Sequence, residues 1–162
     1  MAEKINILFQ YKPESEMVSR QQLPDGCKLV KFVPSFIDVL KKKATFTEYI
    51  WKLITADNYV LYCVKNHNDD VIHKSAKVGW CYKFSFLKKN EYEIGPCHTA
   101  KNWRGKGIYP FVLKQIISDN PQANYYMFID EKNTSSINGV KKAGFMPVGS
   151  VKRCQNGQWR RI

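Results

Sequence analysis

The sequence predicts one domain, residues 1–162, of the α/β class (α+β type), with a mixed, mostly antiparallel central sheet flanked by helices. Three observations support this. Short runs rich in Val, Tyr and Ile, separated by polar turns, are typical of an antiparallel meander. In the last third, two amphipathic segments alternate with strand-like runs, which adds strands to the same sheet. No repeat, low-complexity tract or Gly/Ser linker divides the chain.

The expected strands are short apolar or alternating runs bounded by turn residues. They are residues 5–10, 27–33, 59–65, 71–87, 91–99, 125–129 and 145–153. The run 71–87 is the longest, and a break is expected near Lys74-Ser75. Residues 12–22 are polar and predict an exposed loop. The segment Gln155-Asn156-Gly157 predicts a hairpin turn into Trp159.

Helices are predicted where apolar residues recur every three or four positions. Residues 35–54 suit one or two helices with a break near Ala44-Thr45, and residues 105–118 carry one apolar stripe. A further helix is expected over residues 133–143, ended by Gly144 in the position of a left-handed cap.

Composition describes an ordinary globular protein, with 44% hydrophobic and 25% charged residues. No run approaches the roughly 18 apolar residues needed to span a membrane, and the N-terminus lacks a secretory signal. We therefore expect a cytoplasmic protein with no membrane partner, a monomer or a homodimer. Five scattered cysteines without a Cys-x-x-Cys pair, and three unpaired histidines, predict free thiols and no metal site.

The formal net charge of +12 indicates an anionic partner, an anionic substrate or simply solubility. A nucleic-acid binder is the alternative from a different class, since Trp51, Trp80 and Trp103 could stack on bases. The basic residues are spread along the whole chain, which weakens the case for a dedicated binding arm. We therefore do not favour nucleic acid as the partner.

The most informative segment is a strand that runs through a loop containing Gly105 and Gly107 into an amphipathic helix. Backbone amides at such a helix start lack internal partners and coincide with the positive end of the helix dipole, which favours phosphate. Glycine lets an anion approach the backbone, and Arg104 and Lys106 add positive charge. The loop lacks the signatures of NTPases and of dinucleotide folds, which disfavours ATP and NAD.

The loop resembles the phosphate-loop signature Gln/Arg-x-x-Gly-x-Gly/Ala of the GNAT superfamily of acyl-CoA N-acyltransferases. Arg104 and Gly107 match that signature, and Tyr109 departs from it. A later family motif, Asn followed after a helix by Gly-Phe, is similar to Asn133 with Gly144-Phe145. The resemblance covers roughly residues 30–152 and implies a GNAT-like fold with acetyl-CoA (coenzyme A) as the cofactor.

The resemblance also implies where the cofactor binds. The backbone of Thr99 would pair with pantetheine, and the amide of Cys97 would face the thioester carbonyl, where a fixed dipole stabilises developing negative charge. Asn133 would contact the cofactor or cap its helix. The full expected cofactor-binding set is Cys97, His98, Thr99, Arg104, Gly105, Lys106, Gly107, Ile108, Tyr109 and Asn133.

Acid and base residues are expected beside the cofactor, because an amine must lose a proton before it attacks. Glu93 lies where some family members carry a glutamate base, and alternation along the strand predicts that Glu93 and Cys97 share a face while His98 points to the other. The tyrosine acid of many family members is replaced by Val140, which leaves Tyr109 and Tyr126 as candidates.

The expected function is transfer of an acetyl (acyl) group from acetyl-CoA to a primary amine, by direct attack, on a small or nucleotide-linked acceptor. Glu93, Cys97 and Tyr126 are the expected catalytic residues, with Cys97 acting through its amide. A CoA-binding relative without catalysis is the alternative that Val140 and Tyr109 suggest.

Overall fold

The computed structural model describes residues 5–11, 22–56 and 58–162. Within these ranges the strands form one eight-stranded sheet in the order β2-β3-β4-β5-β6-β1-β7-β8. Every neighbouring pair is antiparallel except β5 and β6, which are parallel. The strands are β1 (Ile5–Tyr11), β2 (Lys28–Phe32), β3 (Tyr59–Lys65), β4 (Val71–Val78), β5 (Glu91–Thr99), β6 (Asn124–Asp130), β7 (Phe145–Arg153) and β8 (Trp159–Arg161). The predicted fold class is confirmed.

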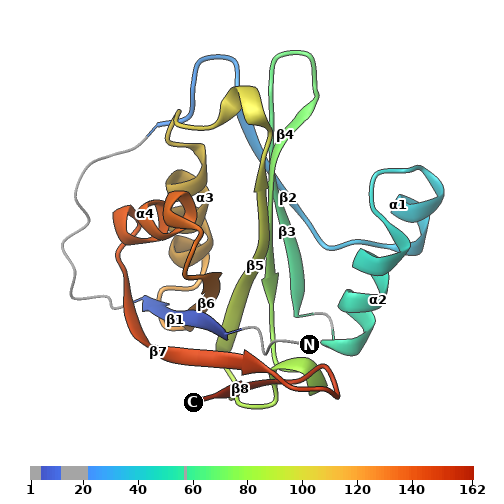
Figure 1. Cartoon of the computed structure of the whole chain (residues 1–162). Helices are drawn as coiled ribbons and strands as arrows, with labels where there is room; N and C mark the ends of the chain where they lie inside the picture. The colour runs from blue at the N-terminus through green and yellow to red at the C-terminus, as the bar shows by residue number, and fades with distance from the viewer. Residues whose placement is uncertain (1–4, 12–21, 57) are drawn as a thin grey trace.

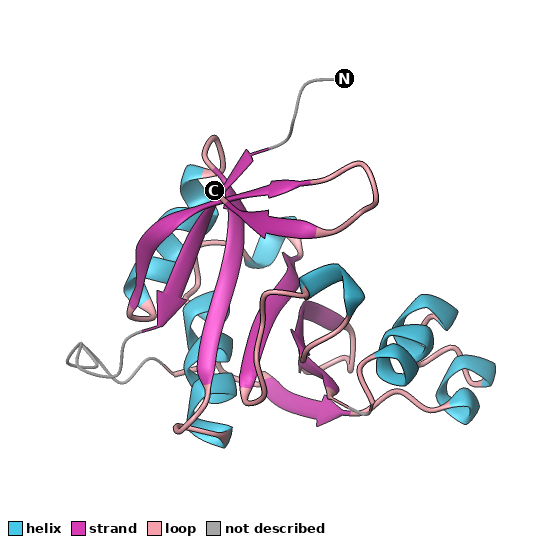
Figure 2. Cartoon of the chain, turned by 90° about the horizontal axis from the view of Figure 1, so that it is seen from below, coloured by secondary structure: helices cyan, strands magenta, loops and turns pink. Residues whose placement is uncertain are grey.

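Four helices flank this sheet in two pairs on opposite sides (Figure 1). They are α1 (Phe36–Leu40), α2 (Phe46–Ile54), α3 (Ile108–Asp119) and α4 (Thr134–Lys142). The view from below shows the strands as a curved layer between the pairs (Figure 2). No helix in the described part of the chain is long and apolar enough to cross a bilayer.

The core is divided between the two faces of the sheet. On the α3 side, Val112, Leu113 and Ile116 pack against buried strand residues such as Tyr62 and Ile94. This is the apolar stripe that the helical periodicity predicted. On the other face, a second cluster gathers around Leu8, Leu61 and Phe84.

Most predicted elements match the structure closely. The break near Ala44 separates α1 from α2, Gly144 has the left-handed φ of +91°, and the hairpin turn leads into Trp159. The predicted strand 71–87 is wrong beyond Val78, where a bend and a 3₁₀ turn at Tyr82–Phe84 replace it, and β4 runs unbroken through Lys74-Ser75, where a break was expected. Phe84 and Leu87 are buried in the second cluster, and their apolar character explains why the sequence pattern predicted a strand there. The predicted loop over 12–22 lies, apart from residue 22, outside the described residues.

The N-terminal strand β1 occupies the interior of the sheet rather than an edge. It pairs with β6 on one side and with β7 on the other, both antiparallel. Its residues feed both clusters, with Phe9 and Tyr11 on the α3 side and Leu8 on the opposite face. The first strand of the chain thereby joins the last hairpin to the rest of the sheet.

Candidate functional site

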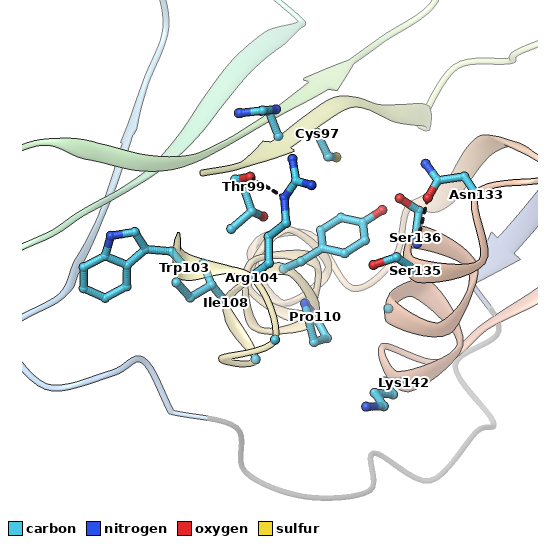
Figure 3. Close-up of a pocket in the computed structure, with 15 residues that line it drawn as sticks. Cys97, Thr99, Trp103, Arg104, Ile108, Pro110, Asn133, Ser135, Ser136 and Lys142 are labelled. Carbon is cyan, nitrogen blue, oxygen red and sulfur yellow. Dashed lines mark hydrogen bonds between the residues drawn. The ribbon is translucent and has the colours of Figure 1, made fainter. Parts of the chain in front are cut away.

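The site begins where two parallel strands separate. β5 and β6 pair over only three residues, from Glu91 opposite Asn124 to Glu93 opposite Tyr126. Beyond that point β5 continues to Thr99 and β6 to Asp130 without pairing to each other. A pocket of about 470 Å³ adjoins the far end of β5 (Figure 3). Its lining residues are Cys97, His98, Thr99, Trp103, Arg104, Gly105, Gly107, Ile108, Tyr109, Pro110, Asn133, Ser135, Ser136, Gly139 and Lys142.

Along the end of β5 that does not pair with β6, some backbone groups point away from β4, toward the side of β6. The amide of Ala100 donates to the Ile72 carbonyl on β4, so Ala100 faces β4. Backbone groups alternate in direction along a strand, and those of Cys97 and Thr99 therefore point away from β4. The carbonyl of Thr99 instead accepts a hydrogen bond of 3.0 Å from Arg104 Nε (Figure 3).

The start of α3 offers backbone amides to the pocket. Gly105 and Gly107 adopt left-handed φ angles of +78° and +76°, and no atom lies within 4 Å of the position that a Cβ would take at either residue. The first backbone bond of the helix runs from the Phe111 amide to the Gly107 carbonyl, and Pro110 carries no N–H. In the described ranges, the amides of residues 105–109 have no backbone acceptor. This arrangement suits an anion.

Positive charge surrounds this loop, but not as the sequence suggested. The ammonium of Lys106 lies 4.4 Å from the centre of the Trp103 ring, in a cation–π contact, and Lys106 does not line the pocket. Lys142, on the last turn of α4, does line it. The pocket therefore has Arg104 from the loop and Lys142 from the opposite wall as its cations (Figure 3).

The predicted alternation along β5 is wrong after Ile94. Ser75 of β4 pairs with Cys97 and Lys77 pairs with Ile94, so Gly95 and Pro96 together face Ala76. This β-bulge shifts the alternation by one residue. The side chain of Glu93 therefore lies on the face opposite to that of Cys97, and His98 shares the face of Glu93. Lys74 lies opposite His98 in the strand register, and its ammonium forms an ion pair with Glu48 of α2. The face that carries Glu93 and His98 is therefore the α2 side of the sheet.

Glu93 is a buried carboxyl, with only 7% of the residue exposed. Its carboxyl lies against Gly95, where a Cβ would overlap it. Within the described residues, no hydrogen bond holds this carboxyl, and Lys83 is the nearby cation that favours its charged form. Burial dominates and raises the pKa of Glu93 to about 8. A carboxyl that titrates near neutral pH is suited to accept a proton.

A buried polar network underlies the Cys97 end of the pocket. His73 on β4 contacts the Thr99 hydroxyl through Nδ1 at 2.7 Å and the Ser75 hydroxyl through Nε2 at 2.8 Å. Burial lowers the pKa of His73 to about 4, so the ring is neutral. Burial also raises the pKa of the Cys97 thiol to about 12, against the opposing effect of a hydrogen bond with Ser75. A protonated thiol is a poor nucleophile, which disfavours covalent catalysis by Cys97.

The two tyrosine candidates lie in different places. Tyr109 lines the pocket together with Cys97, its ring centre is 5.9 Å from that of His73, and its hydroxyl donates a hydrogen bond of 3.9 Å to Met127 Sδ. Burial raises the pKa of the Tyr109 phenol above its ordinary value. The Tyr126 hydroxyl instead bonds to Glu91 at 3.4 Å, near the start of β5, and Tyr126 does not line the pocket. The structure brings Tyr109, and not Tyr126, together with Cys97.

The wall formed by α4 was largely missed by the sequence reasoning. Asn133 caps the helix by accepting a bond of 3.1 Å from the Ser136 amide, which is the capping alternative that the sequence left open. Ser135, Gly139 and Lys142 also line the pocket. Their spacing of four and three residues places them on one helix face, and this signal was available in the sequence.

Gly139 allows close contact between α4 and α3. A Cβ at this position would lie 2.6 Å from Tyr109 Cδ1 and 2.9 Å from Cε1. Gly139→Ala is therefore expected to destabilise the protein, because overpacking costs about 1–3 kcal/mol and exceeds the roughly 1 kcal/mol gained in helix propensity. Chemical denaturation measures the change. Asn138→Ala, on the exposed side of α4, is the control and should be neutral or slightly stabilising; a stabilised Gly139→Ala would contradict the packing argument.

Other sites offer less. A second hollow, lined by Trp80, Lys88 and Glu91 among others, lies at the start of β5 and contains none of the predicted site residues. Residues 5–11, 22–56 and 58–162 contain no group of three His, Cys, Asp or Glu side chains that could hold a metal ion.

Comparison with known proteins identifies the fold. A GCN5-related N-acetyltransferase from Sphaerobacter thermophilus aligns over 94% of this chain and 51% of its own, with a TM-score of 0.64 and 13% identity. A tandem GNAT protein from the clavulanic acid biosynthesis pathway aligns over 100% of this chain and 53% of its own, with a TM-score of 0.62 and 10% identity. An aminoglycoside acetyltransferase, solved with coenzyme A and kanamycin, aligns over 83% of this chain and 92% of its own, with a TM-score of 0.54 and 13% identity. No family model and no sequence of a characterised protein matches the chain.

The sheet and pocket define an α/β protein in which a glycine-containing loop, with backbone amides that have no backbone acceptor, follows the first of two separating parallel strands. More particularly, the chain has the fold of the GCN5-related N-acetyltransferases. It spans about half the length of the first two of these structures.

Proposed function

We propose that the chain is an N-acyltransferase that binds acetyl-CoA and moves the acetyl group to a primary amine by direct attack. The observation that carries the proposal is the group of backbone amides at residues 105–109, which lack internal acceptors and adjoin a pocket at the separated end of β5. Such amides favour a diphosphate, and the unpaired strand edge beside them favours an amide-bearing chain.

The pocket residues fit a coenzyme A thioester. The glycine positions are open to an anion, and Arg104 and Lys142 add positive charge. Thr99 and Cys97 would supply backbone groups to the pantetheine arm, and the side chains of Asn133 and Tyr109 would lie next to its thiol end. Acetyl-CoA would supply the acetyl group in activated form, as a thioester.

Three groups of this chain would act on the reaction. Glu93 would accept the proton of the attacking amine, directly or through water, because its pKa lies near 8. The Cys97 amide would stabilise negative charge on the thioester oxygen. Tyr109, whose phenol is held protonated by burial, could donate a hydrogen bond to the departing thiolate. A thiolate is also a tolerable leaving group without a dedicated acid, since thiols ionise near pH 8.5.

The acceptor side is the face that carries Glu93. Lys83 lies near Glu93 and 4.8 Å from the centre of the Trp51 ring, and Trp51 stacks on Phe84. A cation beside aromatic rings suits an acceptor that carries both a flat group and negative charge. This supports a small or nucleotide-linked amine over a strongly basic acceptor.

Calorimetric titration with coenzyme A tests the proposal. Gly107→Ala is expected to weaken binding by about 10- to 100-fold, since hydrogen bonds to charged groups contribute roughly 1.5–3 kcal/mol and a Cβ would hold the phosphate away. Gly157→Ala is the matched control, because Gly157 has a similar φ of +83° and open surroundings but lies in the β7–β8 hairpin.

No heat of binding for coenzyme A to the unmodified chain would overturn the proposal. Incubation with acetyl-CoA and a panel of amines then separates an enzyme from a relative that binds without turnover. Acetylated product is the expected result.

A further inference from the structure

The helical hairpin α1–α2 (residues 36–54) has its amphipathic pattern turned outward. None of the residues in either helix is buried. In α2 the side toward the sheet carries Trp51, which stacks on the buried Phe84, and Glu48, which pairs with Lys74. The helix ends on this side at the buried Thr55, whose hydroxyl bonds to the Trp51 carbonyl. The opposite side of α2 carries Phe46, Ile50 and Leu53. An ordinary surface helix shows the reverse arrangement, with its apolar stripe against the core.

The same inversion continues into α1. Phe36, Ile37 and Leu40 are exposed. The ring centre of Tyr49 in α2 lies 5.9 Å from that of Phe36, which connects the two helices, and 6.4 Å from that of Phe46 in its own helix. We call the exposed set the outer apolar face; its members are Phe36, Ile37, Leu40, Phe46, Ile50 and Leu53, each between 37% and 68% exposed. Single exposed apolar residues are ordinary, whereas a contiguous set marks an interaction surface.

Local structure stabilises both helices without a partner. Ser35 with Asp38, and Thr45 with Glu48, form complete capping boxes at the starts of the two helices. Each box satisfies backbone amides that would otherwise be free. The hairpin is therefore preformed, and it stands at the edge of the molecule in both views (Figures 1 and 2).

The charge beside the outer apolar face is positive. Lys41, Lys42 and Lys43 lie in the turn between the helices and are exposed. The carboxylates of the hairpin are already engaged, Asp38 by the Ser35 backbone and hydroxyl and Glu48 by Lys74 and Thr45. A second copy of the chain would bring another three lysines and another +12 of charge to the same surface, which disfavours self-association.

We propose that the outer apolar face and the lysines 41–43 dock the protein onto an anionic lipid surface. Apolar side chains at the depth of the headgroups, flanked by lysines, are what an interfacial helix requires. The sequence-based expectation of no membrane partner rested on the lack of a spanning segment, and surface docking needs none.

Co-sedimentation with vesicles of phosphatidylcholine, with and without phosphatidylglycerol, tests the proposal on the whole chain without coenzyme A. Binding is expected only to the anionic vesicles. Lys41→Gln/Lys42→Gln/Lys43→Gln should lower the partition coefficient on the order of 100-fold, because each basic residue near the surface adds close to a fivefold factor. Lys88→Gln/Lys89→Gln/Lys132→Gln removes equal charge elsewhere and should lower it far less.

Ile50→Ser/Leu53→Ser should abolish binding while leaving the melting temperature nearly unchanged, because both side chains are already exposed. Absence of binding to anionic vesicles, or equal loss in both lysine triples, would overturn the proposal. So would a dimer in analytical ultracentrifugation that Ile50→Ser/Leu53→Ser dissociates, which would show that a second copy covers the face. Vesicle binding and coenzyme A binding are measured separately, so this proposal and the proposed function can fail independently.

Discussion

Glu93→Gln is expected to lower the rate of acetyl transfer by about 100-fold or more, within the range typical of a lost general base. The amide is similar in shape to the carboxyl but cannot accept the amine proton. Because the Glu93 pKa lies near 8, the rate with the unmodified enzyme should rise with pH until about pH 8. Affinity for coenzyme A should change little, since Glu93 lies on the α2 side of the sheet and does not line the pocket.

Single-turnover rates between pH 6 and 10 measure this effect. Comparison of the two proteins at each pH removes the contribution of the amine's own ionisation. Glu91→Gln, two residues earlier in the same strand, is the control and should keep most of the activity, because Glu91 bonds to the Lys88 amide and to Tyr126 instead. Near-normal turnover by Glu93→Gln would exclude Glu93 as the base.

The second large effect is on stability. The folded state raises the pKa of Glu93 from 4.5 to about 8, so it binds the proton more tightly than the unfolded chain. The contribution of Glu93 to the free energy of unfolding should therefore decrease as pH rises from about 4.5 to about 8 and then level off. By linkage at 1.36 kcal/mol per pH unit, the loss is on the order of 3–5 kcal/mol.

Urea denaturation of the unmodified protein and of Glu93→Gln, from pH 5 to 9, checks this prediction. The variant should become the more stable of the two as pH rises, because it has no charge to bury. Subtracting the stability curve of one protein from that of the other also removes the contribution of His73. The pKa of His73 is lowered to about 4, so His73 makes stability rise between about pH 4 and 6.5, opposite to the effect of Glu93. Parallel pH curves for the two proteins would show that the Glu93 carboxyl is not desolvated in the fold.

Local sequence patterns predicted much of the fold and of the pocket. Alternation and turn residues predicted β3 and β5 with their observed bounds, and the Ala44 break between helices was readable from spacing. The segment from Arg104 to Tyr109 predicted an anion loop because glycine conformation and free amides at a helix start are local properties. The structure places those residues together at one pocket, with Lys106 turned aside onto Trp103.

Only the tertiary structure decided which side chains share a face of the sheet. Pairing with β4 places Gly95 and Pro96 opposite one residue, and this bulge separates Glu93 from the face of Cys97. The place of β1 between β6 and β7 follows from pairing with strands more than a hundred residues away in the sequence. Helical periodicity located α2, but contacts with distant residues, Glu48 with Lys74 and Trp51 with Phe84, accompany an orientation that leaves its main apolar stripe outward. Periodicity along a chain fixes the kind of element, whereas its register and orientation depend on partners that are distant in the sequence.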